Sequence, residues 1–193
     1  MHPLRRVFWG FLIVFVDIRL GGFDVIPDVI GWVIVLAGLL AVSAQHAALR
    51  IALIAASIAL VVGFVTEYVL ASPSTADGTV WGVLDTVAST VFIFAMCTGM
   101  RDLARAAGNE RIAAQADVVR WLDVALTVVV LAIAAAAGFP EERIGIGSSS
   151  ALPLLALPLL AFVAIALAVV IWFLVLLFLC GRTQDVVQPA PAA

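Results

Sequence analysis

Charged residues are scarce in this chain. They make up 12% of its 193 residues, whereas 65% of the residues are hydrophobic, and the mean hydropathy is +1.22. An ordinary water-soluble domain has about 25% charged and about 45–50% apolar residues. A fold of this size cannot bury so much apolar surface within itself, so the composition predicts a protein surrounded by lipid. The small net charge of −3 and the lack of a basic patch give no indication of a nucleic-acid partner.

Lysine is missing altogether, and cysteine and histidine occur only twice each. Cys97 is predicted in the middle of a membrane span and Cys180 at the last turn of another, which fits neither a disulfide framework nor a metal site. His2 is terminal and His46 lies in a short loop, so the histidines do not have the spacing of a zinc site. We therefore expect no metal or other cofactor.

Long hydrophobic runs, by contrast, fill most of the chain. A helix needs about 20 apolar residues to cross the ~30 Å hydrocarbon core of a bilayer. Six stretches qualify, and glycine, proline and serine punctuate the breaks between them: 4–21, 25–44, 49–70, 79–100, 119–138 and 154–180. The predicted fold class is an all-α membrane protein with six transmembrane helices in one domain, residues 1–182, followed by a disordered cytoplasmic tail, residues 183–193. Pro153 and Pro158 predict a kinked or interfacial entry into the last span.

The distribution of arginine predicts the orientation in the membrane. If the N-terminus is cytoplasmic, eight of the ten arginines face inward and only Arg19 and Arg143 face outward. This asymmetry is the one that membrane proteins show, because cytoplasmic loops carry an excess of basic residues. The inward set is Arg5, Arg6, Arg50, Arg101, Arg105, Arg111, Arg120 and Arg182. We therefore expect both termini in the cytoplasm and a location in a bacterial cytoplasmic membrane.

The junction between the first two spans has the sequence GGFDVIPD, residues 21–28. Gly21-Gly22 can end a helix in a left-handed conformation. Asp24 can then cap the next helix, with Pro27 in its first turn, and Asp28 suits the positive end of the helix dipole. A tight Gly-Gly hairpin between helices 1 and 2 thus accounts for the whole stretch on structural grounds alone.

The same acids also have a functional interpretation. The first span is short, which draws its end below the outer membrane surface, and two further acids fall near the outer ends of spans 3 and 4. A charge at such depth costs at least ~2.5–3.5 kcal/mol and usually has a partner or a polar cavity. The predicted cation- or proton-binding layer is Asp17, Asp24, Asp28, Glu67 and Asp85, with Arg19 as counter-charge. The structural alternative is that Arg19 pairs with Glu67 or Asp85 while the other acids touch bulk water.

One sizeable cytoplasmic segment, residues 101–121, separates spans 4 and 5. Gly108 followed by Asn109 predicts a helix stop and a new N-cap, so we expect two helical extensions bent at Gly108. Asp123 follows Arg120 by three residues, and this spacing predicts a local ion pair on one helix face. The segment is also a candidate surface for regulation or partner docking.

The segment GFDVIPDVIGW, residues 22–32, resembles a stretch of the form G-F-D-x-x-P-D-x-I-G found in small uncharacterised bacterial multi-pass membrane proteins. The resemblance covers spans 1 and 2 and implies no particular activity. The size and span count are also similar to the substrate-binding subunits of vitamin transporters of the energy-coupling-factor type. Asp24-x3-Asp28 resembles the end of the CDP-alcohol phosphotransferase motif, but the upstream half of that motif is missing here.

Two hypotheses for function follow. The leading one is a transport-type component with an outward-facing acidic cavity that binds a cation or a proton. The alternative is a non-catalytic membrane scaffold or accessory subunit, which would use small-residue stripes such as Gly31/Gly38 and Ala37/Ala41 and the segment 101–121. An enzyme ranks third, because the sequence shows no nucleophile–base pair and no metal set. The expected partners are the lipid bilayer and either a membrane protein or a second copy of the chain.

Overall fold

The computed structural model describes residues 3–15, 19–20, 23–24, 28–44, 46–65, 75–136 and 152–187. Within them the chain forms six helices, one at each predicted hydrophobic stretch: α1 (Pro3–Phe15), α2 (Asp28–Leu40), α3 (Ala47–Phe64), α4 (Thr75–Ala106), α5 (Glu110–Ala136) and α6 (Leu152–Val187). Three segments are long and apolar enough to cross a membrane, namely Ala47–Phe64, Val80–Ala106 and Leu160–Arg182, whereas the apolar helix Asp28–Leu40 is shorter. The protein is therefore helical, and its helices suggest a membrane location.

The connection between α1 and α2 differs from the predicted helix-to-helix hairpin. The strands β1 (Arg19–Leu20) and β2 (Phe23–Asp24) pair antiparallel, with Arg19 opposite Asp24. Gly-Gly is a favoured two-residue connection in β-hairpins, and this local preference explains why strands form where the sequence suggested helix ends. Asp24 therefore belongs to a strand and is not the N-cap of α2, which begins at Asp28. Gly21, Gly22 and Pro27 lie outside the described residues.

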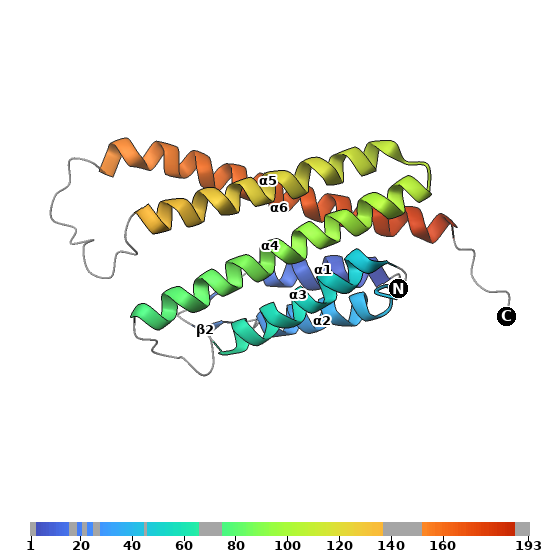
Figure 1. The fold of residues 1–193 in the computed structure, drawn as a ribbon, viewed down its shortest axis with the longest axis horizontal. Coiled ribbons are helices and arrows are strands. Elements are labelled where there is room, and N and C mark those ends of the chain that lie inside the picture. Colours follow the sequence, from blue (N-terminus) through green and yellow to red (C-terminus); the bar gives the residue numbers. More distant parts are fainter. Residues whose placement is uncertain are drawn as a thin grey trace.

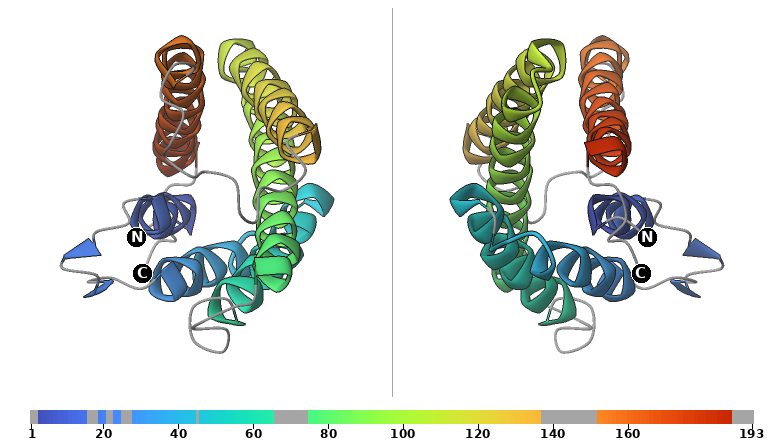
Figure 2. Two further views of the ribbon diagram at one scale, coloured as in Figure 1. Left: turned by 90° about the vertical axis from the view of Figure 1, so that its left-hand side faces the viewer. Right: turned by 90° about the vertical axis from the view of Figure 1, so that its right-hand side faces the viewer.

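Successive helices run in opposite directions, so that the start of α1 and the end of α6 lie at the same end of the bundle (Figure 1). Each helix packs against the next one along the chain, and α6 returns to pack against α1 and α4. Viewed along the bundle, the helices form a ring (Figure 2). We call the end with the start of α1, the end of α6, the α2–α3 turn and the α4–α5 turn the arginine-rich end. The opposite end, with the β1–β2 ribbon and the starts of α2 and α4, is the acidic end.

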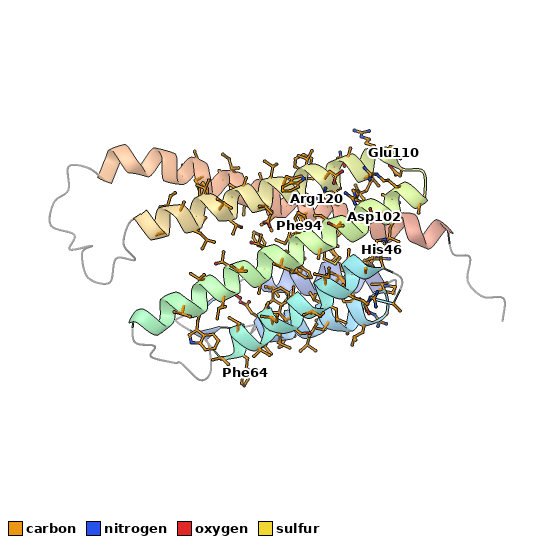
Figure 3. The ribbon with its side chains drawn as sticks, viewed as in Figure 1. His46, Phe64, Phe94, Asp102, Glu110 and Arg120 are labelled. Carbon is orange, nitrogen blue, oxygen red and sulfur yellow. The ribbon has the colours of Figure 1, made fainter. Side chains whose placement is uncertain are left out.

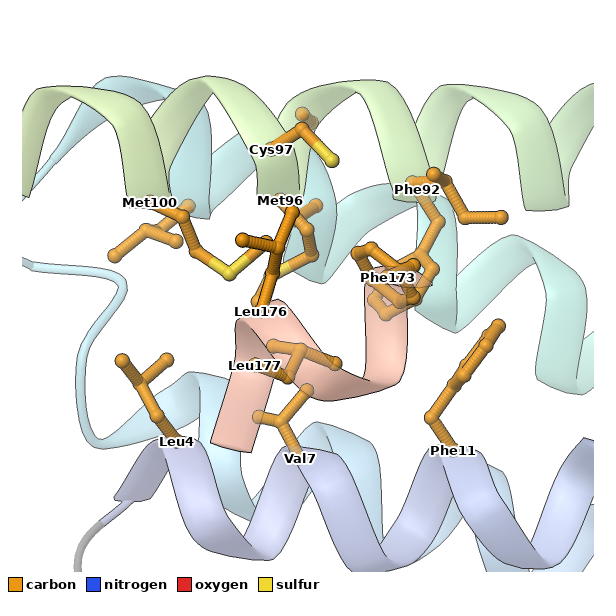
Figure 4. Packing of buried hydrophobic residues seen from close by; sticks show 14 of the residues in the cluster. Leu4, Val7, Phe11, Phe92, Met96, Cys97, Met100, Phe173, Leu176 and Leu177 are labelled. Carbon is orange, nitrogen blue, oxygen red and sulfur yellow. The ribbon is translucent and has the colours of Figure 1, made fainter. Parts of the chain in front are cut away.

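Aromatic side chains from four helices fill the centre of the ring. Phe11 of α1 stacks on Phe92 of α4 with ring centroids 5.4 Å apart, and Phe173 of α6 meets Phe11 edge-on at 5.2 Å. Trp32 of α2 meets Phe92 edge-on at 5.3 Å. Edge-to-face and offset contacts of this kind add to the free energy of burying the rings. Figure 4 shows Phe11, Phe92 and Phe173 beside an aliphatic and sulfur-containing layer that lies toward the arginine-rich end and is made of Leu4, Val7, Met96, Cys97, Met100, Leu176 and Leu177.

Glycines bring α1 and α2 into close contact. A Cβ atom added at Gly10 would lie 2.7 Å from the Gly31 carbonyl oxygen, and one at Gly31 would lie 2.7 Å from the Gly10 carbonyl oxygen. Gly38 packs in the same way against the backbone at Pro3. Gly31 and Gly38 thus pack α2 against α1 within the bundle, since only residues without a side chain permit this approach. Ala37 and Ala41, by contrast, are exposed.

The turn between α4 and α5 matches the predicted stop-and-cap pattern. Gly108 has a φ of +72°, and the backbone N–H of Asn109 donates to the Ala104 carbonyl at 2.8 Å while that of Gly108 donates to Arg105 at 2.9 Å. These two bonds define a Schellman motif. The Asn109 side-chain oxygen then accepts from the Ile112 N–H at 3.2 Å, as an N-cap does. The turn therefore fixes how α5 leaves α4.

The final helix, α6, is continuous through Pro158 and extends past the predicted bundle boundary to Val187. Pro153 lies in its first turn, where a missing N–H leaves no hydrogen bond unmade. Residues 188–193 of the predicted tail lie outside the described residues.

Candidate functional site

The predicted acidic layer falls partly within the described residues. Asp24 pairs with Arg19 through the backbone of the β1–β2 ribbon, which lies at the acidic end (Figure 1). Asp28 lies in the first turn of α2 and is partly buried, with its Oδ1 atom inaccessible to solvent. Asp17 and Glu67 lie outside the described residues. The convergence of five acids on one cavity therefore stays a prediction.

Asp85 is the acid of this set whose surroundings are best defined. It is an exposed residue of α4 and belongs to the candidate span Val80–Ala106. Apolar neighbours in the same stretch are exposed as well: 60% for Val80, 44% for Leu84 and 42% for Val87. In a bilayer, a carboxylate on such a surface needs a proton, a cation, water or a protein partner. The helix α3 lies between α2 and α4 in the ring, so Asp28 and Asp85 come from helices that are not ring neighbours.

The eight arginines predicted to face inward are all described, and seven belong to the helix ends that form the arginine-rich end. Arg5 and Arg6 lie in the first turns of α1, and Arg50 lies in the first turn of α3. Arg101 and Arg105 belong to the last turns of α4, Arg111 to the start of α5 and Arg182 to the end of α6. The eighth, Arg120, lies further along α5. Side chains of this end, including His46, Asp102 and Glu110, gather around the α4–α5 turn (Figure 3).

Asp117 of α5 is the centre of an ion-pair network at this end. Its carboxylate oxygens lie 2.8 Å from Arg120 Nη2, 3.4 Å from Arg101 Nη1 and 3.6 Å from Arg105 Nη2. Two of these guanidinium groups come from α4 and one from α5, so the network joins the two helices on the bundle side of Gly108. A carboxylate shared by three arginines is held by charge-assisted hydrogen bonds and is not available to bind a further cation.

Asp102 extends the network to the α2–α3 turn. It accepts a hydrogen bond from Arg101 Nε at 2.9 Å, and its other oxygen lies 3.5 Å from His46 Nε2. Arg105 also reaches Glu110 at 3.9 Å, but the Glu110 side chain is 78% exposed, so this contact contributes little. The arginines of the network thus meet acids in comparable number, and the charges largely compensate one another.

Arg120 is the least exposed arginine of the network, with 13% of its side chain accessible. Its guanidinium lies 5.2 Å from the Phe94 ring centroid and 5.5 Å from that of Trp121, which places it within cation–π range of both. Nη1 donates to Thr98 Oγ1 at 3.3 Å while Nη2 pairs with Asp117. The residue is therefore fixed in position by four neighbours from α4 and α5.

The predicted pair between Arg120 and Asp123 is not formed. Arg120 pairs with Asp117, one helical turn in the other direction. Long side chains in a helix point back toward its N-terminus, so the partner at i−3 is reached more easily than the one at i+3. Asp123 has no ion pair in the described part of the chain, and its Oδ2 atom is buried without a hydrogen-bond partner. Reasoning from the sequence treated Asp123 as half of a surface pair and overlooked it as a candidate site.

Neither end presents a catalytic constellation within the described ranges. No group of three or more His, Cys, Asp or Glu residues among them is arranged to hold a metal ion. Cys97 and Cys180 are buried in the core, away from solvent. The aspartates of the network are bound by arginines, so they are not placed to activate a nucleophile.

An apolar groove of about 220 Å³ lies on the side of the bundle between α3, α4 and α5. Thr90 lines it, but its hydroxyl is bonded to Thr127 Oγ1 at 2.8 Å. Thr98 lines it too, and its hydroxyl donates to the Phe94 carbonyl at 2.8 Å. The groove therefore offers no free polar group and suits an acyl chain better than a polar substrate. Its lining consists of Ala48, Ile51, Thr90, Val91, Phe94, Ala95, Thr98 and Val124.

Comparison with known proteins gives no relative for this chain: no protein-family model, no curated protein and no solved structure matches it.

Proposed function

We propose that the protein is a multi-pass membrane protein of the transport type, which binds a proton or a small cation at its acidic end. The observation that carries the proposal is Asp85, a carboxylate on the exposed apolar surface of a candidate membrane span. A charge in that position is costly in lipid and marks ion and proton pathways in membrane proteins. Asp28, at the start of α2, supplies a second carboxylate toward the same end.

The difference between the two ends supports an orientation for this function. With six spans and both termini in the cytoplasm, the arginine-rich end faces inward, as the positive-inside rule requires. The acidic end then faces outward and meets ions from outside the cell. Helices that alternate in direction, with the start of α1 and the end of α6 at one end of the bundle, agree with this arrangement (Figure 1).

Cysteine labelling tests the orientation. The variants Asp24→Cys and Gly108→Cys place one thiol on the β1–β2 ribbon and one on the α4–α5 turn. A membrane-impermeant maleimide added to intact cells should label position 24, and position 108 should react only after the membrane is permeabilised. Labelling of position 24 from the cytoplasmic side alone would overturn the proposed orientation.

Ion uptake tests the function. The full chain is reconstituted into vesicles that contain a pH-sensitive dye, and a proton, sodium or potassium gradient is applied. Wild-type vesicles should show gradient-dependent flux that Asp85→Asn and Asp28→Asn abolish. The matched control is Glu110→Gln, which removes a carboxylate charge at the opposite end on a side chain that is 78% exposed. Absence of flux in the wild type, or equal loss in Glu110→Gln, would contradict the proposal.

The alternative of a non-catalytic scaffold or accessory subunit has its own supporting observation. One face of α3 exposes four large apolar side chains at helical spacing: Ile51, Ile54, Ile58 and Val61, each between 49% and 60% exposed. Lipid or a partner helix can cover such a face. A partner that co-purifies in a fixed ratio in mild detergent, together with vesicles that conduct no ion, would favour this alternative.

A further inference from the structure

Asp123 of α5 is a carboxylate with no counter-charge among the residues that the structure describes. The nearest arginine along the helix, Arg120, directs Nη2 to Asp117 and Nη1 to Thr98. Within the described residues Asp123 forms no ion pair, and Oδ2 is buried without a hydrogen-bond partner. Satisfied carboxylates elsewhere at this end, such as Asp102 with Arg101 at 2.9 Å, show that arginine partners are plentiful there. Asp123 is therefore an exception in its own neighbourhood.

Asp123 is half-buried as a residue, and its Oδ2 atom is inaccessible to solvent. From α4, the Cys97 thiol is fully buried and within electrostatic reach of Asp123. Cys97 is in turn within reach of Cys180 of α6, which is 3% exposed, and of Arg120 and Asp117 of α5. Arg120 is the one cation among these titratable groups, and it is bound by Asp117. The titratable groups near Asp123 thus include a buried thiol and an ion pair that is already formed.

A half-buried carboxylate with one oxygen shielded from water and no hydrogen-bond partner for that oxygen has few stable states. An ionised group removed from water without a partner costs far more free energy than its neutral form. A metal ion would need several ligands, and no group of three metal-binding side chains exists among the described residues. A proton needs only the carboxylate itself. Asp123 also lies near the inner boundary of the predicted fifth span, so cytoplasmic water can supply and accept that proton.

We propose that Asp123 is a proton-binding site in the inner half of the bundle. In the resting state the carboxyl group carries a proton, while Arg120 is held by Asp117 as the structure shows. Release breaks only the O–H bond of the carboxyl group and passes the proton to water at the arginine-rich end. The resulting carboxylate then competes with Asp117 for Arg120, because the two acids stand three residues on either side of it. Proton binding at Asp123 is thereby coupled to the network that joins α4 to α5.

Infrared difference spectroscopy on the purified full chain tests this proposal, with spectra taken at acidic, neutral and alkaline pH. The wild-type protein at neutral pH should show the carbonyl stretch of a protonated carboxyl group, and alkaline pH should remove it. Asp123→Asn should lack one carboxyl group's share of this band at neutral pH. The matched control Asp102→Asn, which alters an arginine-bound aspartate at the same end, should keep the band in full.

A second variant, Asp123→Glu, is the control for the case in which Asp123→Asn fails to fold. Asp123→Glu keeps the acid, so the band should persist at a shifted frequency. A band that is unchanged in both Asp123→Asn and Asp123→Glu, or absent from the wild type at neutral pH, would overturn the proposal. Because the measurement needs no ion gradient, its failure is distinct from failure of the transport proposal. Asp85→Asn, measured in the same way, shows whether a carboxyl group at the acidic end contributes to the band.

Discussion

The two ends of the bundle handle charge in opposite ways. At the arginine-rich end, Asp117 lies against three guanidinium groups and Asp102 lies between Arg101 and His46. At the acidic end, Asp85 is exposed among apolar side chains of a candidate membrane span. Charges that form ion pairs hold helices together, whereas an unpaired charge lowers the stability of the fold. The comparison teaches that acids outside the arginine network, such as Asp85, are better candidates for a function than Asp117 and Asp102.

This difference between the two ends predicts that, among the acids compared, Asp117 contributes most to the free energy of unfolding. In Asp117→Asn, Arg101 keeps Asp102 and Arg105 keeps Glu110, but Arg120 loses the one anion that it contacts among the described residues while remaining largely buried. Removing one partner of a buried ion pair costs about 3–5 kcal/mol, and partial exposure of this network lowers the expected loss to about 2–3 kcal/mol. Reversible unfolding in mixed micelles measures the change. Glu110→Gln is the control and should stay within about 0.5 kcal/mol of the wild type.

A smaller loss is expected for Arg120→Lys. Lysine keeps the charge beside Asp117, but it cannot also donate to Thr98 and stack on Phe94 and Trp121. Losing the planar guanidinium contacts should cost about 1 kcal/mol. The exposed Arg111→Lys is the matched control and should unfold like the wild type. Equal stability of both variants would mean that Arg120 acts only as a point charge.

The α4–α5 turn, which positions the ion-pair network, should also contribute measurably to the free energy of unfolding. Gly108→Ala places a side chain at a φ of +72°, which should cost about 1 kcal/mol. Gly82→Ala, in the interior of α4 where an added Cβ meets no atom within 4 Å, should instead stabilise the protein by up to about 1 kcal/mol. If the two substitutions change the free energy of unfolding in opposite directions in the same assay, Gly108 acts through its backbone conformation.

Hydropathy and local signals predicted much of this fold from the sequence. The six hydrophobic stretches became the six helices, and Gly108-Asn109 formed the predicted stop and N-cap, because both features depend on residues that are adjacent in the chain. The junction at residues 19–24 was predicted wrongly, since Gly-Gly suits a helix end and a two-residue β-hairpin equally well. The spacing of the residues alone did not show whether a helix end or a β-hairpin forms there.

The candidate sites, too, could be predicted from the sequence only in part. Arg120 stands three residues from both Asp117 and Asp123, and only the backward lean of helical side chains favours Asp117. The contact of His46 with Asp102 joins segments far apart in the sequence, so no local pattern indicated it. Asp85 was identified from depth in a hydrophobic stretch, a property of the sequence itself. Asp123 emerged only once the partners of its neighbours were known.

The smallest effect on stability is expected at Asp85, and it decides between the two interpretations of the acidic end. If Asp85 serves ion binding, the fold gains nothing from its charge, so Asp85→Asn should unfold within about 0.5 kcal/mol of the wild type, as surface substitutions do. Asp85→Leu, which matches the exposed Leu84 beside it, should be at least as stable. A loss comparable to that of Asp117→Asn would instead mean that Asp85 pairs with a basic group in the folded protein. The same unfolding assay run on these variants and on Asp117→Asn therefore tests whether the two ends differ in kind.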